Sequence, residues 1–314
     1  MMLFDFALIV GGLVVLLIAG DLLVRGAVNL ALRLGIPALL VGMTVVAFGT
    51  SAPELLVSVQ ANLEGAGGLA LGNVVGSNVA NILLVMGAPA LIAAVAVGRE
   101  ITRDYMIMLG ATALFIGVSM TGAIGTWQAL VLLGAFSLFM VDSIRRGLRE
   151  RVEVDELEGA DPAISGAKIG LFVALGIVGL PLGAQLQVTG AVGVAEALGV
   201  SDVLIGLTIV AVGTSLPELA TTLMAAIRRE GGVALGNVVG SNLFNLLFIL
   251  GVAGLFGTMT IPEQMLRVDL WVMLGASLLL APFIWRAAPI GRVAGVSFLV
   301  AYAGYVATLV VSGA

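Results

Sequence analysis

Two stretches of this sequence decide the fold, because one is nearly a copy of the other. Residues 42–55 read GMTVVAFGTSAPEL, and residues 206–219 read GLTIVAVGTSLPEL. The glutamates in them, Glu54 and Glu218, set a shift of 164 positions (218 − 54). At the same shift, ALGNVVGSNVAN at 70–81 returns as ALGNVVGSNLFN at 234–245. Two matched motifs at one constant spacing indicate an internal duplication.

The sequence around these motifs is apolar enough for an integral membrane protein. Of its 314 residues, 60% are hydrophobic and 11% are charged, and the mean hydropathy is +1.18. Apolar runs of about 20 residues, the length that crosses a hydrocarbon core of about 30 Å, recur along the chain. The chain has neither Cys nor His, which excludes disulfides, thiolate chemistry and imidazole metal ligands. No basic patch indicates a nucleic-acid partner.

Hydropathy predicts an all-α protein with ten transmembrane helices. The spans are predicted near 4–31, 36–62, 68–95, 104–122, 126–146, 165–195, 201–227, 232–257, 268–285 and 292–312. With the N-terminus outside, the inner loops hold Arg33, Arg99, Arg103, Arg145, Arg146, Arg149, Arg151, Lys168, Arg228, Arg229, Arg286 and Arg292, and the outer loops hold only Arg267. Because positive charge favours the cytoplasmic side, we expect both termini outside a cell membrane.

The chain divides into two halves at its longest polar stretch, RRGLRERVEVDELEGADPA at 145–163. We predict a first repeat at 1–147, a cytoplasmic linker at 148–164 and a second repeat at 165–314. Five spans per repeat is an odd number, so the second copy would enter the membrane upside down. Such inverted repeats are typical of secondary transporters, whose binding sites lie near the bilayer midplane.

The GTSxPE motif predicts a broken helix lined by oxygen atoms. Pro53 lacks the N–H that would bond to the carbonyl of Gly49, so the helix must break or kink there. Thr50, Ser51 and Glu54 supply oxygens around the break. The second copy repeats the arrangement with Gly213, Thr214, Ser215, Pro217 and Glu218. A carboxylate at the bilayer centre costs about 2.5 kcal/mol or more, so two of them require a cation or protons.

The GNVVGSN motif predicts a second helix that faces the broken helix and carries further oxygen atoms. Gly72 and Gly76 allow close helix approach, and Asn73, Ser77 and Asn81 follow at i, i+4 and i+8. Carboxylates, hydroxyls and amide oxygens without nitrogen or sulfur ligands suit hard cations such as Ca²⁺. A packing role explains GNVVGSN alone, and a plain kink explains Pro53 alone. The duplicated Pro-Glu pair favours ion binding, since no basic residue of a nearby span could pair with the glutamates.

These motifs resemble the two alpha-repeats of the cation/calcium antiporter superfamily, and within it the sodium/calcium exchangers of prokaryotic size. The resemblance implies a core of spans 2, 3, 7 and 8 holding four cation sites, across which the long spans 1 and 6 slide. Matching motif positions imply these ligands: Glu54, Glu218 and the backbone oxygens of Thr50 and Thr214 for Ca²⁺; Ser51, Ser77, Ser215, Ser241 and the carbonyls of Ala47 and Ala211 for Na⁺; Asn81 and Asn245 for the middle site.

The predicted function is secondary antiport of Ca²⁺ against Na⁺ by alternating access, not enzymatic catalysis. Ca²⁺ and Na⁺ are the expected partners besides the lipid bilayer. We expect no organic cofactor and no obligatory protein partner, so that a monomer suffices. Asn at both 81 and 245, where potassium-dependent relatives carry Asp at the second position, predicts no K⁺ requirement.

Two alternatives stay open. A Ca²⁺/H⁺ antiporter would use the same fold, but that branch typically carries Glu and His where this chain has Gly76 and Ser77, or Gly240 and Ser241. A cation channel would pass current with no counter-ion.

Asp21 and Arg25, one helical turn apart, are interpreted as a local ion pair or as snorkelling charges, with a gating role as the less favoured alternative. Their counterparts Gln185 and Thr189 are uncharged, which argues against a symmetric function.

Overall fold

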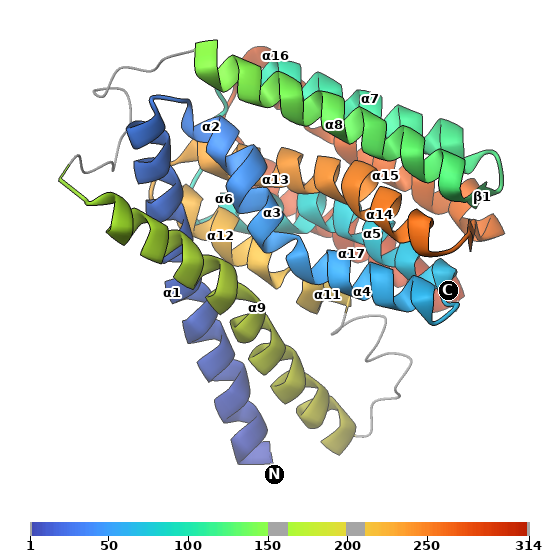
Figure 1. Ribbon diagram of the computed structural model, residues 1–314. Helices are drawn as coiled ribbons and strands as arrows, with labels where there is room; N and C mark the ends of the chain where they lie inside the picture. The colour runs from blue at the N-terminus through green and yellow to red at the C-terminus, as the bar shows by residue number, and fades with distance from the viewer. Residues whose placement is uncertain (1, 150–162, 199–210, 313–314) are drawn as a thin grey trace.

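The computed structural model describes residues 2–149, 163–198 and 211–312, and it is helical apart from one short strand pair (Figure 1). In these residues eight helices are long and apolar enough to cross a membrane, and a bent pair of helices makes a ninth candidate. The predicted span at 201–227 lies partly outside the described residues, which begin again at position 211. The total of ten spans therefore stays a prediction.

The first half begins with one long helix and ends with two helices that are long enough to span a membrane, with shorter helical segments between them. Its elements are α1 (Met2–Leu34), α2 (Ala38–Val41), the π-helical η1 (Gly42–Val46), α3 (Ala47–Thr50), α4 (Ala52–Leu63), α5 (Gly67–Ala80), the π-helical η2 (Asn81–Val85), α6 (Gly87–Ile92), α7 (Ile101–Ser119), β1 (Ala123–Ile124) and α8 (Thr126–Arg149).

The described helices of the second half follow a similar order, but its strand precedes the last spanning helices instead of lying between them. Its elements are α9 (Gly166–Ala197), α11 (Ala211–Thr214), α12 (Leu216–Ile227), α13 (Gly231–Leu243), the π-helical η5 (Phe244–Ile249), α14 (Leu250–Phe256), β2 (Met259–Thr260), the π-helical η6 (Met265–Asp269), α15 (Leu270–Leu279), α16 (Ala281–Arg286) and α17 (Arg292–Ser312).

Helices α1 and α9 pack together along a seam of glycines and run obliquely to α7 and α8 (Figure 1). A Cβ on Gly12 would lie 2.6 Å from the backbone nitrogen of Gln187, and one on Gly176 would lie 2.5 Å from the Cβ of Leu23. Gly12 and Gly176 are equivalent in the duplication, and so are Leu23 and Gln187. Equivalent residues therefore contact each other reciprocally, and the two helices run antiparallel.

The centre of the molecule is formed by α5 and α13, which carry the GNVVGSN motifs. A Cβ on Gly236 would lie 2.6 Å from the carbonyl oxygen of Leu39, and one on Gly240 would lie 2.6 Å from that of Met43. The close approach predicted for Gly72 and Gly76 is thus seen at their equivalents in α13, whereas a Cβ on Gly72 or Gly76 would meet no described atom within 4 Å. The equivalent neighbours of α5 would be residues 203 and 207, which lie outside the described residues.

Two short backbone pairings join the halves at the ends of α7. Val95, before α7, pairs with Ile290, and Ile124, after α7, pairs with Met259 in the antiparallel β1–β2 ribbon. Met259 is the equivalent of Val95 in the duplication. Equivalent residues of the two halves therefore lie at opposite ends of a spanning helix.

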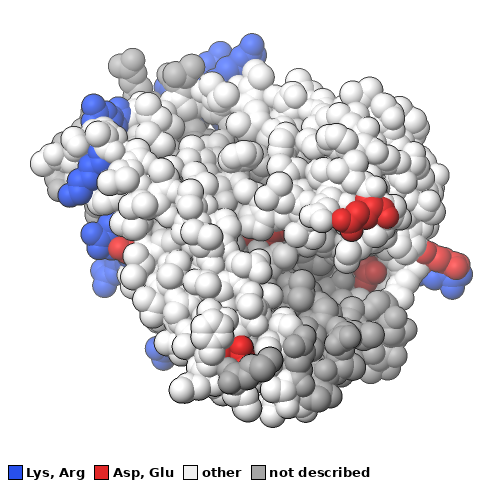
Figure 2. All heavy atoms as spheres, turned by 60° about the horizontal axis from the view of Figure 1, so that its bottom comes forward, with Lys and Arg blue, Asp and Glu red and all other residues white. Residues whose placement is uncertain are grey.

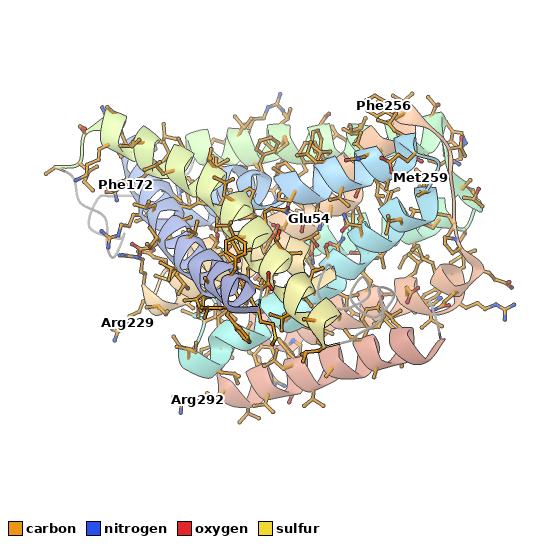
Figure 3. All side chains as sticks on the ribbon, turned by 90° about the horizontal axis from the view of Figure 1, so that it is seen from below. Glu54, Phe172, Arg229, Phe256, Met259 and Arg292 are labelled. Carbon is orange, nitrogen blue, oxygen red and sulfur yellow. The ribbon has the colours of Figure 1, made fainter. Side chains whose placement is uncertain are left out.

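Charged side chains are distributed unequally between the two ends of the molecule that α7 connects. Lys and Arg side chains gather along one edge of the molecule, whereas at the opposite edge blue is seen only beside red (Figure 2). Arg229 and Arg292 lie at one end, and Phe256 and Met259 lie at the other (Figure 3). We refer to the end that carries Arg229 and Arg292 as the basic end.

Candidate cation site

Each GTSxPE motif forms a helix break of the same shape. The backbone of Ser51 has φ −86° and ψ 6°, and that of Ser215 has φ −86° and ψ 2°. The segments Ala38–Thr50 and Ala52–Leu63 meet at 47°, which confirms the predicted break. Pro53 and Pro217 occupy the first turns of α4 and α12, where a missing N–H costs no helical hydrogen bond.

The breaks place both glutamates inside the protein. Glu54 and Glu218 lie in the first turns of α4 and α12, and each is 1% exposed. The positive end of a helix dipole favours a carboxylate at this position. Glu54 lies midway between the two ends of the molecule (Figure 3).

Hydroxyl groups of the first break reach the second half. The Ser51 hydroxyl donates to Oε1 of Glu218 at 2.9 Å. The Thr50 hydroxyl lies 3.1 Å from Oδ1 of Asn237 and 3.4 Å from Oγ of Ser241. These contacts join residues of both motifs and both halves, and one of them reaches the carboxylate of Glu218.

Asparagines of the second motif hold the broken helices in place. Asn73 donates to the carbonyl of Glu54 at 3.4 Å and to the Ser58 hydroxyl at 3.0 Å. Asn237 donates in the same way to the carbonyl of Glu218 at 3.3 Å and to the Thr222 hydroxyl at 3.0 Å. We call these two arrangements the asparagine clamps. The sequence analysis missed them, although a hydroxyl residue four positions after each glutamate was the available signal.

The predicted middle-site amides, Asn81 and Asn245, are fully buried but differently bonded. Asn81 donates from Nδ2 to Oδ1 of Asn242 at 3.1 Å, whereas neither polar atom of Asn245 has a hydrogen-bond partner in the described part of the chain. Asn81 begins the π-helical η2, and Asn245 lies in the π-helical η5. Such π-helical turns are frequent at functional sites.

The remaining predicted ligands lie on the same elements. Thr50 and Ala47 are in α3, Thr214 and Ala211 are in α11, Ser77 is in α5 and Ser241 is in α13. The carbonyl of Ala47 already has a donor, because it accepts from the Ser51 backbone N–H at 3.0 Å, and the Thr50 hydroxyl lies 3.3 Å from it.

Buried oxygens that lack a donor indicate what the site can hold. Among the described residues these include Oε2 of Glu54, Oε2 of Glu218, Oδ1 of Asn81, Oγ of Ser215 and Oδ1 of Asn245. A buried acceptor without a donor is costly, and a bound cation removes that cost. The described part of the chain has no cluster of three or more His, Cys, Asp or Glu side chains, so neutral oxygens must complete any cation shell.

The sequence matches the profile of the family described as sodium/calcium exchanger protein, over residues 4–145 and 168–311. The chain belongs to this family. The two matched segments leave unmatched the polar stretch in the middle of the chain. Together with the apolar helices, the match identifies a multi-pass membrane protein.

Relatives with names and solved structures agree with this assignment. The chain is 37% identical to the putative antiporter CaxA of Alkalimonas amylolytica, with 94% of this chain and 95% of the relative covered. It is 33% identical to the sodium/calcium exchanger MaX1 of Methanosarcina acetivorans, with 97% and 98% covered. The solved structure of the sodium-calcium exchanger NCX_Mj, soaked with zero Na⁺ and Ca²⁺, superposes with a TM-score of 0.86 at 32% identity, covering 98% of this chain and 100% of that one.

Proposed function

We propose that this protein is a secondary antiporter that exchanges Ca²⁺ for Na⁺ across a cell membrane by alternating access. The observation that carries the proposal is the pair of buried carboxylates at two matched helix breaks, surrounded by oxygens that lack donors. Membership of the sodium/calcium exchanger family supports it. A transporter of this class needs no covalent chemistry and no organic cofactor.

The electrostatics of the site account for exchange. Two ionised glutamates carry two negative charges, which balance one Ca²⁺, and Ca²⁺ accepts six to eight oxygen ligands. In this proposal Glu54 and Glu218 bind Ca²⁺, and serine and asparagine side chains complete the Ca²⁺ and Na⁺ sites. When Ca²⁺ leaves, monovalent cations must neutralise the same charge, because buried carboxylates without counter-charge are costly.

The proposed architecture is a pair of inverted repeats, at 1–147 and 165–314, joined by the linker at 148–164. The antiparallel α1 and α9 support it, since equivalent glycines contact equivalent residues. The strand pairing supports it too, because Val95 and its equivalent Met259 lie at opposite ends of α7. With five spans in each half, both termini lie outside and the basic end faces the cytoplasm.

The test is uptake of radioactive Ca²⁺ into proteoliposomes loaded with Na⁺, with K⁺ loading and an imposed pH gradient as parallel conditions. Uptake that requires internal Na⁺ is the expected result, and omission of K⁺ should leave it unchanged. Uptake driven by a pH gradient alone would assign a Ca²⁺/H⁺ antiporter instead. Ca²⁺ current with no counter-ion on the far side would indicate a channel.

A further inference from the structure

Asp21 of α1 joins this helix to the core of the protein. It pairs with Arg25 of the same helix at 2.9 Å and also with Arg228, which directly follows α12. The side chains of Asp21 and Arg228 are 21% and 29% exposed. From the sequence, Asp21 and Arg25 were interpreted as a local ion pair or as snorkelling charges, and the contact with Arg228 was not predicted because Arg228 lies 207 positions away from Asp21 along the chain.

Helices α1 and α12 are in direct contact beside this pair. A Cβ on Gly20 would lie 3.1 Å from the carbonyl oxygen of Ala220, so the two backbones approach closely. Helix α12 begins with the break that carries Glu218, and Arg228 follows its other end. The ion pair therefore connects the long α1–α9 unit to a helix of the candidate site, at the basic end.

A small cavity of about 80 Å³ lies beside the ion pair, lined by Val24, Arg25, Val28, Arg228 and Glu230. Two arginines and two acidic groups, Asp21 and Glu230, thus meet where α1 contacts the end of α12. Val28 is only 2% exposed.

The other half has no equivalent ion pair in the described residues. The equivalent of Asp21 is Gln185, and the equivalent of Arg228 is Glu64. The amide of Gln185 donates to Thr189 on its own helix, and Glu64 accepts from Gln60 on its own helix. The charged connection between the long helices and the core is therefore present at the basic end, and the matching positions at the opposite end do not form one.

We propose that Asp21 and Arg228 are positioning residues that make the two access states of the exchanger unequal in free energy. This inference rests on the proposed alternating-access function. Two repeats of equal sequence would give the two states similar free energies, and an interaction formed in one state shifts the population toward it. The Asp21–Arg228 pair favours the state in which α1 covers the basic end of α12.

The first readout is the ratio of the Ca²⁺ KM values measured at the two faces of oriented proteoliposomes. Asp21→Asn and Arg228→Gln should each lower KM at the basic face relative to the opposite face by about three- to fivefold, the factor that a partly exposed ion pair supplies. Arg228→Lys keeps the charge and should change the ratio less. A defect confined to folding would reduce the maximal rate without changing this ratio.

The second readout uses the absence of cysteine from this chain. A single cysteine at Val28→Cys lies in the cavity beside the ion pair and can react with a membrane-impermeant maleimide. Labelling from the basic face should accelerate by about three- to fivefold when Asp21→Asn is added, because the covered state becomes less populated. Labelling does not depend on transport, so it is measurable even if the counter-ion is not Na⁺.

Asp142→Asn is the matched control. Asp142 is also an aspartate that pairs with two arginines, Arg103 at 2.7 Å and Arg146 at 3.2 Å, but it lies on α8 and its partners lie on α7 and α8. Its removal should change neither the KM ratio nor the labelling rate. The inference is overturned if Asp21→Asn leaves both readouts unchanged or if Asp142→Asn changes them equally. Loss of Na⁺-driven uptake in the wild type would instead contradict the proposed function.

Discussion

The two halves of the protein carry nearly the same motifs but use them differently. The backbone angles of Ser51 and Ser215 at the helix breaks agree to within a few degrees. The hydrogen-bond lengths of the two asparagine clamps agree to about 0.1 Å. In contrast, Ser51 of the first half donates to Glu218, whereas the Ser215 hydroxyl has no hydrogen-bond partner in the described residues. Contacts within a half thus follow from its sequence, while contacts between the halves depend on the state of the whole molecule.

The glutamates should show the largest effect and no difference between the halves. Glu54→Gln or Glu218→Gln leaves one carboxylate for a divalent ion, so Ca²⁺ uptake should fall at least about 100-fold in either variant. Glu64→Gln, at an exposed position that follows α4, is the control and should keep wild-type uptake. Near-normal rates in either buried variant would contradict the proposed site.

The asparagine clamps should give the next largest effect. Asn73→Leu and Asn237→Leu each remove donors to a buried hydroxyl and to the carbonyl of a glutamate, which should destabilise the protein by about 1–3 kcal/mol. Asn237 also accepts from Thr50, so its replacement should cost more. Thermal unfolding in detergent, measured alongside uptake, tests this order. A larger loss for Asn73→Leu would show that the halves differ in a way that these contacts do not explain.

Ser51 and Ser215 test whether the two halves exchange conformations during transport. If the halves exchange conformations during transport, Ser51 and Ser215 each serve the opposite glutamate in one access state. Ser51→Ala and Ser215→Ala should then raise the Ca²⁺ KM at opposite faces, each by about tenfold, the value of one hydrogen bond to a charged group at the low end of its range. The Ca²⁺ KM measured at each face of oriented vesicles tests this prediction. An increase of the Ca²⁺ KM at the same face in both variants would contradict an exchange of conformations between the halves.

Acid should have the smallest effect, and it should act on both halves alike. Protons compete with Ca²⁺ for the two carboxylates, so Ca²⁺ affinity should fall by less than about twofold between pH 8 and pH 6 and more steeply as the pH approaches the ordinary Glu pKa near 4.3. Equilibrium Ca²⁺ binding across this pH range measures the effect. Binding that stays flat even as the pH falls through about 4.3, the ordinary pKa of a glutamate side chain, would indicate that the carboxylates are not the ligands.

Long-range partners explain why part of the site could not be predicted. The breaks and the burial of the glutamates follow from Pro53, Pro217 and the surrounding apolar sequence, and the first break is confirmed as a 47° bend. The clamps and the Asp21–Arg228 pair were missed because periodicity describes neighbours along one helix. Bonds across 15 and 207 positions depend on how separate helices pack.

The sequence by itself determined the membrane-embedded helices, the duplication at a constant spacing, and a candidate cation site of oxygen-bearing side chains. Each of these depends on composition and local order, which the chain carries wherever it folds. Only the tertiary structure decided which hydroxyl contacts which carboxylate, and that an ion pair joins α1 to α12 at the basic end with no equivalent pair among the described residues of the other half. Nearly identical motifs experience different surroundings once α1 and α9 pack against the core, and those surroundings cannot be read from the motifs.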